Sequence, residues 1–164
     1  MTNEYVVSHS QSKSMPNVHF AELIAAVLSK GKPFRFQAKG YSMSPFIQSG
    51  DIVVISPITG NINPGEVVAI LDSKKHLFIH RVVKICGDKF LVQGDSSPMV
   101  DGWFLRNEML GCVTNVERLT NSVQIGLGPE RIIIAFLSAN NWLIPLVTSY
   151  RKIQSIIKRI IHKR

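Results

Sequence analysis

The order of apolar and polar residues predicts one helix followed by a run of short strands. Residues 17–30 place apolar side chains at helical spacing, and Gly31 ends that pattern. From residue 33 to residue 119, apolar residues fall instead in short stretches separated by Gly, Pro, Asn and Asp, as strands joined by turns require. This spacing predicts a mainly β fold, a coiled or barrel-like sheet with an N-terminal helix and C-terminal helices. The expected strands are 34–39, 51–55, 66–71, 76–85, 88–93, 103–105 and 110–118.

The last quarter of the chain has a different pattern. Residues 132–148 are strongly apolar, but Asn140 and Asn141 interrupt their centre and Pro145 interrupts their end. A full transmembrane span is therefore a weak interpretation of this segment. Residues 149–164 place isoleucines on one helical stripe with Lys and Arg around it. Such a basic amphipathic helix suits either an anionic membrane surface or the surface of its own domain, and the apolar segment before it favours the membrane.

Composition and charge narrow the class of protein. The chain has 164 residues, 45% of them hydrophobic and 18% charged, which excludes intrinsic disorder as the main state and fits one folded domain. Of its 19 Lys and Arg residues, seven lie in 131–164, which holds no Asp or Glu. The first 130 residues hold the remaining 12 basic residues and all 11 acidic ones, so their net charge is close to zero. A near-neutral body gives no reason to expect a nucleic-acid partner. The organisation expected is a flexible polar arm (1–16), a body (17–120) and an apolar and basic tail (121–164).

The two cysteines form no recognisable motif. Cys86 and Cys112 have neither the spacing of a zinc site nor that of a redox pair, and two cysteines make no disulfide framework. We therefore expect free thiols in a reducing compartment.

Three stretches carry polar residues that a β pattern does not require: Ser42 in GYSMSP, His80 in FIHRVV, and Asp101 in GDSSPMVDGW. A serine hydroxyl needs a base to become a nucleophile, and a neutral imidazole suits that task at physiological pH. A carboxylate on the second ring nitrogen holds the imidazole in one tautomer. By residue type alone, a turn serine, a structural histidine and turn-forming Gly-Asp pairs are the commoner explanation.

Taken together and in order, these stretches resemble the type I signal peptidase family, in its endoplasmic-reticulum, archaeal and spore-former branch. The resemblance covers roughly residues 34–118 and implies the coiled β-sheet of that family, with no metal or cofactor. Any one of the shared boxes is a weak signal, whereas the ordered set is specific. The boxes are Ser42-Met43-Ser44-Pro45, Gly50-Asp51, Gly65-Glu66, His80-Arg81, Gly94-Asp95 and Asp101.

The resemblance implies roles for the polar residues. Ser42 would be the nucleophile, His80 the general base, and Asp101 the carboxylate that orients His80. Asp95 would be structural or would assist the site. The Ser42 backbone N–H would belong to an oxyanion hole, and Gly40 stands where many relatives place a second donor, a serine hydroxyl.

The residues next to Ser42 have expected roles as well, and other residues near His80 could in principle act as the base. Met43 and Pro45 would shape the substrate groove and the turn behind the serine. The self-cleaving repressor peptidases are also similar, and they use a lysine base behind a DNA-binding domain. The rival bases near His80 are Lys74, Lys75, Lys84 and His76, but His80 is preferred because it alone lies in the His-Arg box.

The function expected is a serine endopeptidase that cleaves an extended peptide or precursor segment. The main alternative is a non-catalytic peptide-binding or membrane-recruiting module on a peptidase fold, and a third, less favoured one is a nucleic-acid binder that uses the basic tail. Residues 1–33 hold neither a secretory signal nor an apolar helix as long as the N-terminal anchor of membrane signal peptidases. The expected location is therefore cytoplasmic, either soluble or peripheral on the membrane through 149–164, with a dedicated precursor as substrate.

Overall fold

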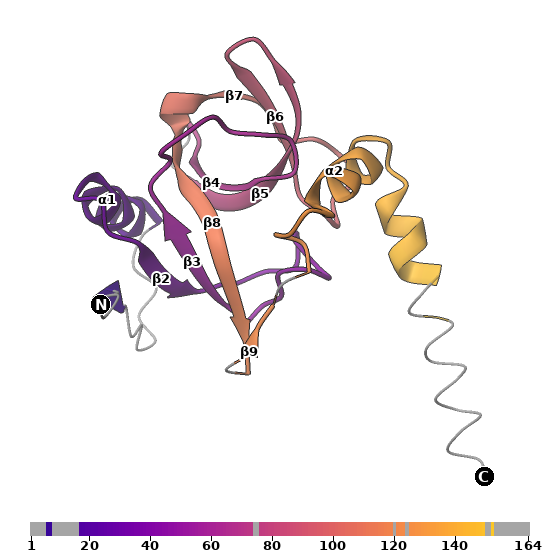
Figure 1. Cartoon of the computed structure of the whole chain (residues 1–164), viewed down its shortest axis with the longest axis horizontal. Coiled ribbons are helices and arrows are strands. Elements are labelled where there is room, and N and C mark those ends of the chain that lie inside the picture. Colours follow the sequence, from indigo (N-terminus) through magenta and orange to yellow (C-terminus); the bar gives the residue numbers. More distant parts are fainter. Residues whose placement is uncertain are drawn as a thin grey trace.

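One coiled β-sheet forms the body of the protein, with helices near its two ends (Figure 1). The computed structural model describes residues 6–7, 17–73, 76–119, 121–123, 125–149 and 152. Its elements are β1 (Val6–Val7), α1 (Asn17–Ser29), β2 (Phe34–Gln37), β3 (Ile52–Ser56), β4 (Val67–Leu71), β5 (Leu77–Cys86), β6 (Lys89–Gln93), β7 (Gly102–Leu105), a 3-10 turn (Arg106–Glu108), β8 (Met109–Arg118), β9 (Asn121–Ser122) and α2 (Arg131–Ala139).

The strands of the described chain lie in the order β1-β2-β3-β8-β4-β5-β6-β7, with β9 paired to β8. Every pairing is antiparallel except that of β1 with β2. The path does not close on itself, so β1 and β7 are its edges. The mainly β fold with helices at both ends is thus confirmed, as a coiled sheet that is not a closed barrel. β1 and β9 were not expected.

The core explains why the sequence alternates in some strands and not in others. In β4, Val67 and Ala69 belong to one hydrophobic cluster, which α1 covers, while Val68 and Ile70 belong to a second cluster on the other face. Both faces of β4 are therefore buried, which is why its sequence VVAIL is apolar throughout.

The apolar segment 132–148 forms two short helices with a sharp bend between them. α2 ends before Asn140, Asn141 has a positive φ of 57°, and a second helix runs over Leu143–Ser149 at 108° to α2. Pro145 was expected to interrupt the end of this segment, and that expectation is wrong. Pro145 lies in the first turn of the second helix, where a missing N–H leaves no helical hydrogen bond unmade. Among the described residues, no single helix is long and apolar enough to cross a membrane, and only this bent pair passes that test jointly.

The segments expected as arm and tail make contacts with the body where they are described. β1 pairs with β2, β9 pairs with β8, and α2 packs against β5. Residues 121–139 therefore continue the body beyond the expected boundary at residue 120. The rest of the expected arm 1–16, and 149–164 apart from Ser149 and Lys152, lie outside the described residues.

Candidate active site

A compact turn between β2 and β3 presents Ser42 at the surface. Gly40 has a positive φ of 97°, which turns the chain away from β2, and the peptide between Ser44 and Pro45 is cis. The Ser44 N–H donates to the Tyr41 carbonyl at 3.0 Å. Met43 is only 4% exposed and belongs to the hydrophobic core, whereas Ser42 is exposed. The buried methionine anchors the turn, so Met43 is a core residue rather than an open groove residue.

His80 comes from the middle of β5, opposite Val68 of β4, and is 8% exposed. The ring of Phe78 lies against it, with 5.0 Å between the ring centroids. His80 Nε2 is 2.8 Å from Ser42 Oγ, and His80 Nδ1 is 2.6 Å from Asp101 Oδ2. Both distances are within hydrogen-bond reach, so side chains from a turn, a strand and a loop form one continuous hydrogen-bond network.

Asp101 is held where β7 begins. Its backbone N–H donates to the Val92 carbonyl of β6 at 2.9 Å, which fixes the residue in the register of the sheet. Its side chain is 27% exposed, compared with 11% for that of His80. The carboxylate therefore meets the imidazole at the rim of the site rather than in its interior.

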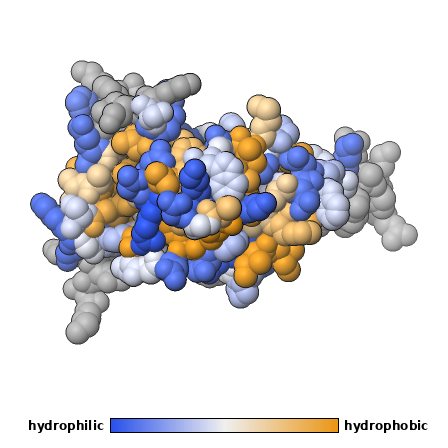
Figure 2. Space-filling view, turned by 90° about the horizontal axis from the view of Figure 1, so that it is seen from above, coloured by the Kyte–Doolittle hydropathy of each residue, from blue (hydrophilic) through white to orange (hydrophobic). Residues whose placement is uncertain are grey.

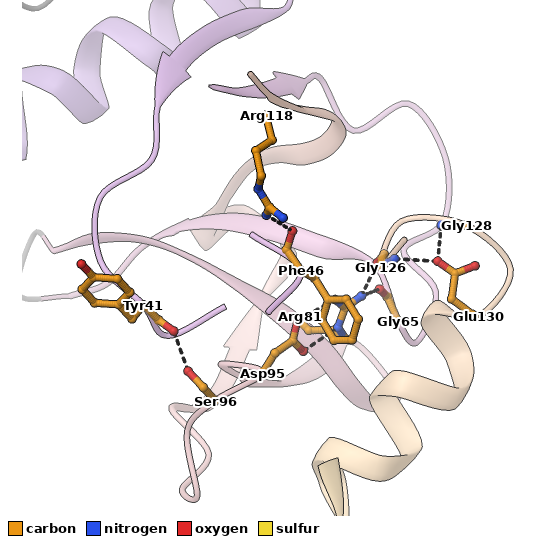
Figure 3. Close-up of polar contacts among 10 residues, drawn as sticks. All are labelled: Tyr41, Phe46, Gly65, Arg81, Asp95, Ser96, Arg118, Gly126, Gly128 and Glu130. Carbon is orange, nitrogen blue, oxygen red and sulfur yellow. Dashed lines mark hydrogen bonds and ion pairs between the residues drawn. The ribbon is translucent and has the colours of Figure 1, made fainter. Parts of the chain in front are cut away.

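Gly94 lets the 94–101 loop approach the Ser42–His80 pair. A Cβ atom at this position would lie 2.9 Å from the Ser42 carbonyl oxygen, closer than such contacts occur in proteins, and 3.0 Å from His80 Nε2, which is tighter than nearly all of them. The next residues clamp the same turn: the Ser96 N–H donates to the Ser42 carbonyl at 2.8 Å, and the Ser96 hydroxyl donates to the Tyr41 carbonyl at 2.6 Å (Figure 3). The Gly94-Asp95 box hinted at Gly94, but nothing in the sequence singled out Ser96.

Asp95 has a structural role next to the candidate site, and its carboxylate bonds to Arg81 rather than to Ser42 or His80. Its carboxylate accepts two hydrogen bonds of 2.7 Å from Arg81, and both side chains are fully buried. The Arg81 guanidinium also donates to the carbonyls of Gly65 (2.7 Å) and Gly126 (2.8 Å), and the ring of Phe46 covers it at 5.6 Å (Figure 3). Burial raises the pKa of Asp95, and the paired guanidinium opposes that rise.

The rival bases lie elsewhere. His76 is exposed and pairs with Asp72 at 3.2 Å, and no hydrogen bond joins it to Ser42. Lys84 is exposed beyond a bulge in β5, while Lys74 and Lys75 lie outside the described residues. No group of three or more His, Cys, Asp or Glu side chains in the described part of the chain is arranged to hold a metal ion.

The surroundings of Ser42 leave its backbone N–H available. That N–H donates to no described residue, so it can serve as an oxyanion donor. At Gly40, nothing lies within 4 Å of the place where a Cβ would be, and the positive φ disfavours any side chain there. Position 40 therefore supplies no side-chain hydroxyl as a second oxyanion donor.

Comparison with known proteins gives a coarser family than the sequence motifs implied. No curated protein matches the chain. A family model described as peptidase S24-like matches residues 5–111, well over half of the chain, and the match includes Ser42, His80 and Asp101. The type I signal peptidase branch is finer than this match and stays a prediction. The chain belongs to the peptidase S24-like family.

Proposed function

We propose that the protein is a serine endopeptidase in which Ser42 is the nucleophile, His80 the general base and Asp101 the residue that orients His80. The observation that carries this proposal is the continuous chain from Ser42 Oγ to His80 Nε2 (2.8 Å) and from His80 Nδ1 to Asp101 Oδ2 (2.6 Å). Membership of a peptidase family supports the reaction class.

The geometry supports an acyl-transfer mechanism. With its proton on Nδ1 and directed at Asp101, the imidazole of His80 accepts the Ser42 proton on Nε2 as Ser42 Oγ attacks the scissile carbonyl carbon. The oxyanion of the tetrahedral intermediate faces the free Ser42 N–H. His80 then returns the proton to the leaving amine, the C–N bond breaks, and water hydrolyses the acyl-enzyme through the same base.

The histidine base supports the finer assignment to a signal-peptidase-like enzyme. The self-cleaving repressor peptidases, which the sequence also resembles, use a lysine base. Here the residue in contact with Ser42 is His80 of the His-Arg box, and Lys84 is exposed away from it. The proposed reaction is therefore cleavage of a separate peptide or precursor segment.

The substrate is expected to bind as an added strand. Asp101 directly precedes β7, which is an edge of the described sheet and so offers main-chain groups to an extended peptide. Trp103 and Leu105 are exposed at alternate positions along this strand, where they would contact alternate side chains of the added peptide. Main-chain pairing would supply affinity and these side chains selectivity.

A mixture of synthetic peptides incubated with the full chain, with mass spectrometry of the products, tests the proposal. Ser42→Ala and His80→Ala should lower kcat/KM by at least about 10³-fold, and Asp101→Asn by about 10²- to 10⁴-fold. Matched controls are Ser49→Ala, another exposed serine of the same turn region, and His76→Ala, which removes a second His–Asp pair. Both controls should cleave at the unmodified rate.

Two further measurements, of peptide binding and of Ser42 labelling by a fluorophosphonate, separate the enzyme from a non-catalytic binding module. Peptide binding with no cleavage, together with no labelling of Ser42 by a fluorophosphonate, would favour the module. Cleavage that persists in Ser42→Ala would show that the nucleophile is assigned wrongly. The 2.8 Å contact between Ser42 and His80 favours catalysis, because a binding module has no need of that geometry.

A further inference from the structure

The bent pair formed by α2 and Leu143–Ser149, together with the bend 140–142 that joins them, is here called the helical elbow and has an apolar outer face. Five of its large hydrophobic side chains are each more than half exposed, and Figure 2 shows hydrophobic side chains reaching the surface in the half of the molecule that leads to the C-terminus. Soluble proteins seldom gather so many large apolar side chains on one short exposed element. The five residues are Ile132, Ile133, Phe136, Trp142 and Leu146.

The inner face of the helical elbow is apolar as well. Ile134, Ala135 and Leu143 are buried, Ser138 is the one buried polar residue of α2, and α2 packs against β5. A surface helix of a soluble domain pairs a buried apolar face with a polar outer one. The helical elbow is thus fixed to the body by one apolar face and presents a second to its surroundings. This fixed inner face argues against a span, because a spanning helix would be surrounded by lipid.

Charge indicates what covers the outer face. The helical elbow leads directly into 149–164, which holds six Lys or Arg residues and no Asp or Glu. On the outer face itself, the Phe136 and Trp142 rings meet edge to face at 6.2 Å, and aromatic rings of this kind are enriched at the lipid–water boundary. Exposed apolar side chains, followed in the sequence by a run of cationic residues, match a surface that is both apolar and anionic.

We propose that the helical elbow is a membrane-surface binding element that docks in the plane of an anionic phospholipid bilayer. Its outer side chains enter the boundary between headgroups and acyl chains, and the basic residues that follow meet the lipid phosphates. Nucleic acid would use the charge but leave the apolar face exposed. A second copy of the chain would cover the apolar face but repel the basic segment.

The helical elbow is connected to the active-site loop. The Gln93 amide donates to the Ser97 carbonyl at 2.8 Å and to Asn141 Oδ1, at the bend, at 3.4 Å. Gln93 directly precedes Gly94, and Met99 of the same loop is 74% exposed. Docking of the helical elbow therefore places the loop that carries Asp101 beside the lipid surface. This inference concerns location and stands whether or not the proposed peptidase activity is correct.

Vesicle flotation of the full chain tests the inference, with phosphatidylcholine vesicles compared with vesicles that also contain phosphatidylglycerol. A Trp103→Phe background leaves Trp142 as the one tryptophan. We expect binding to the anionic vesicles, a blue shift of Trp142 fluorescence, and quenching of that fluorescence by brominated acyl chains. Absence of binding, or binding with Trp142 unquenched, would overturn the proposal.

A matched pair of variants separates apolar docking from charge alone. Ile133→Ser/Phe136→Ser removes two outer side chains, and Leu119→Ser removes a hydrophobic side chain that is 90% exposed at the end of β8. The double variant should raise the vesicle Kd at least about ten-fold, and the control should stay within about two-fold. Unchanged affinity in the double variant would overturn the proposal. So would a dimer in analytical ultracentrifugation that only the double variant dissociates. Thermal unfolding of both variants verifies that they fold.

Discussion

At the scale of single residues, the contact between Ser42 and His80 depends on what is missing at position 94. The 94–101 loop passes over the pair so closely that a methyl group on the Gly94 Cα would lie 2.9 Å from the Ser42 carbonyl oxygen and 3.0 Å from His80 Nε2. The same approach lets the Ser96 N–H reach the Ser42 carbonyl. The loop therefore sets the position of Ser42 from outside the turn that carries it.

Gly94→Ala should for this reason impair activity more than stability. The added methyl group must displace either the Ser42 turn or the His80 ring, and a shift of about 1 Å in such a pair costs about 10²-fold in rate. The measurement is kcat/KM for a cleaved peptide, alongside the thermal unfolding midpoint. Gly60→Ala is the matched control, because nothing lies within 4 Å of its Cβ position. Equal activity in the two variants would mean that the loop adjusts freely.

The two cysteines should react very differently. Burial, and then the neighbouring Glu66 carboxylate, raise the pKa of the Cys112 thiol to about 12, whereas Cys86 is exposed. Because the thiolate is the reactive form, iodoacetamide at pH 8 should modify Cys86 readily and Cys112 at least about 100-fold more slowly than in the unfolded chain. Mass spectrometry of the timed reaction in buffer and in urea measures both rates. Similar rates at the two sites in buffer would contradict the prediction.

At the scale of elements, Asp51 joins the turn that carries Ser42 to the end of β8. Its carboxylate accepts hydrogen bonds from the Gln48 N–H (2.7 Å) and from Arg118 (2.7 and 2.8 Å). Burial alone would raise the pKa of Asp51, but the hydrogen bonds from Arg118 and Gln48 outweigh it, so the pKa is lowered. The Gly50-Asp51 box of the sequence thus has a structural role.

Asp51→Asn should lower the free energy of unfolding at pH 7 by about 1–3 kcal/mol, because it weakens the bonds to Arg118. A carboxyl whose folded pKa is depressed stabilises the fold fully above its unfolded pKa, near 3.9, and loses this effect as the pH falls through the folded value. The difference between the variant and the parent protein should therefore shrink below about pH 4. Urea unfolding between pH 7 and pH 3 measures it, with Asp88→Asn, an exposed turn residue, as control. A difference independent of pH would contradict this account.

The elements that sequence patterns predicted well are those long enough for their pattern of buried and exposed residues to be visible in the sequence. α1 and the seven expected strands were within reach of periodicity because alternate or continuous burial leaves a direct trace in each stretch. β1 and β9 are two residues long, too short for any period, and exist because β2 and β8 offer them partners. The bend at Asn141 left a signal in the paired asparagines, but Pro145 was misread because a proline in a first turn looks the same in sequence as one that ends a helix.

The candidate site divides in the same way. Ser42, His80 and Asp101 were chosen for their chemistry and for the boxes in which they lie, and the structure brings all three together. Ser96 and the close approach at Gly94 were not foreseeable, because both depend on how a loop crosses a turn about 50 residues earlier in the chain.

At the scale of the whole molecule, Arg81 connects segments that are distant in sequence. Its guanidinium bonds to Asp95 of the active-site loop, to Gly65 before β4 and to Gly126 in the turn that leads to α2. The Arg81 side chain is fully buried, with an exposure of 0%. The 94–101 loop and the turn that leads to the helical elbow are therefore held by one buried ion.

Removal of this ion should be the costliest single change considered. Arg81→Met leaves the Asp95 carboxylate buried without its partner, which should lower the free energy of unfolding by about 3–5 kcal/mol. The double variant Arg81→Met/Asp95→Leu removes both charges, so its loss should be clearly smaller than the sum of the two single losses. Urea unfolding at pH 7 gives all three values. Arg35→Met, which breaks a partly exposed pair with Glu117, is the control and should cost about 1 kcal/mol or less. Additive losses would mean that Arg81 stabilises the fold through the Gly65 and Gly126 carbonyls rather than through Asp95. The loop and the elbow would then be held independently.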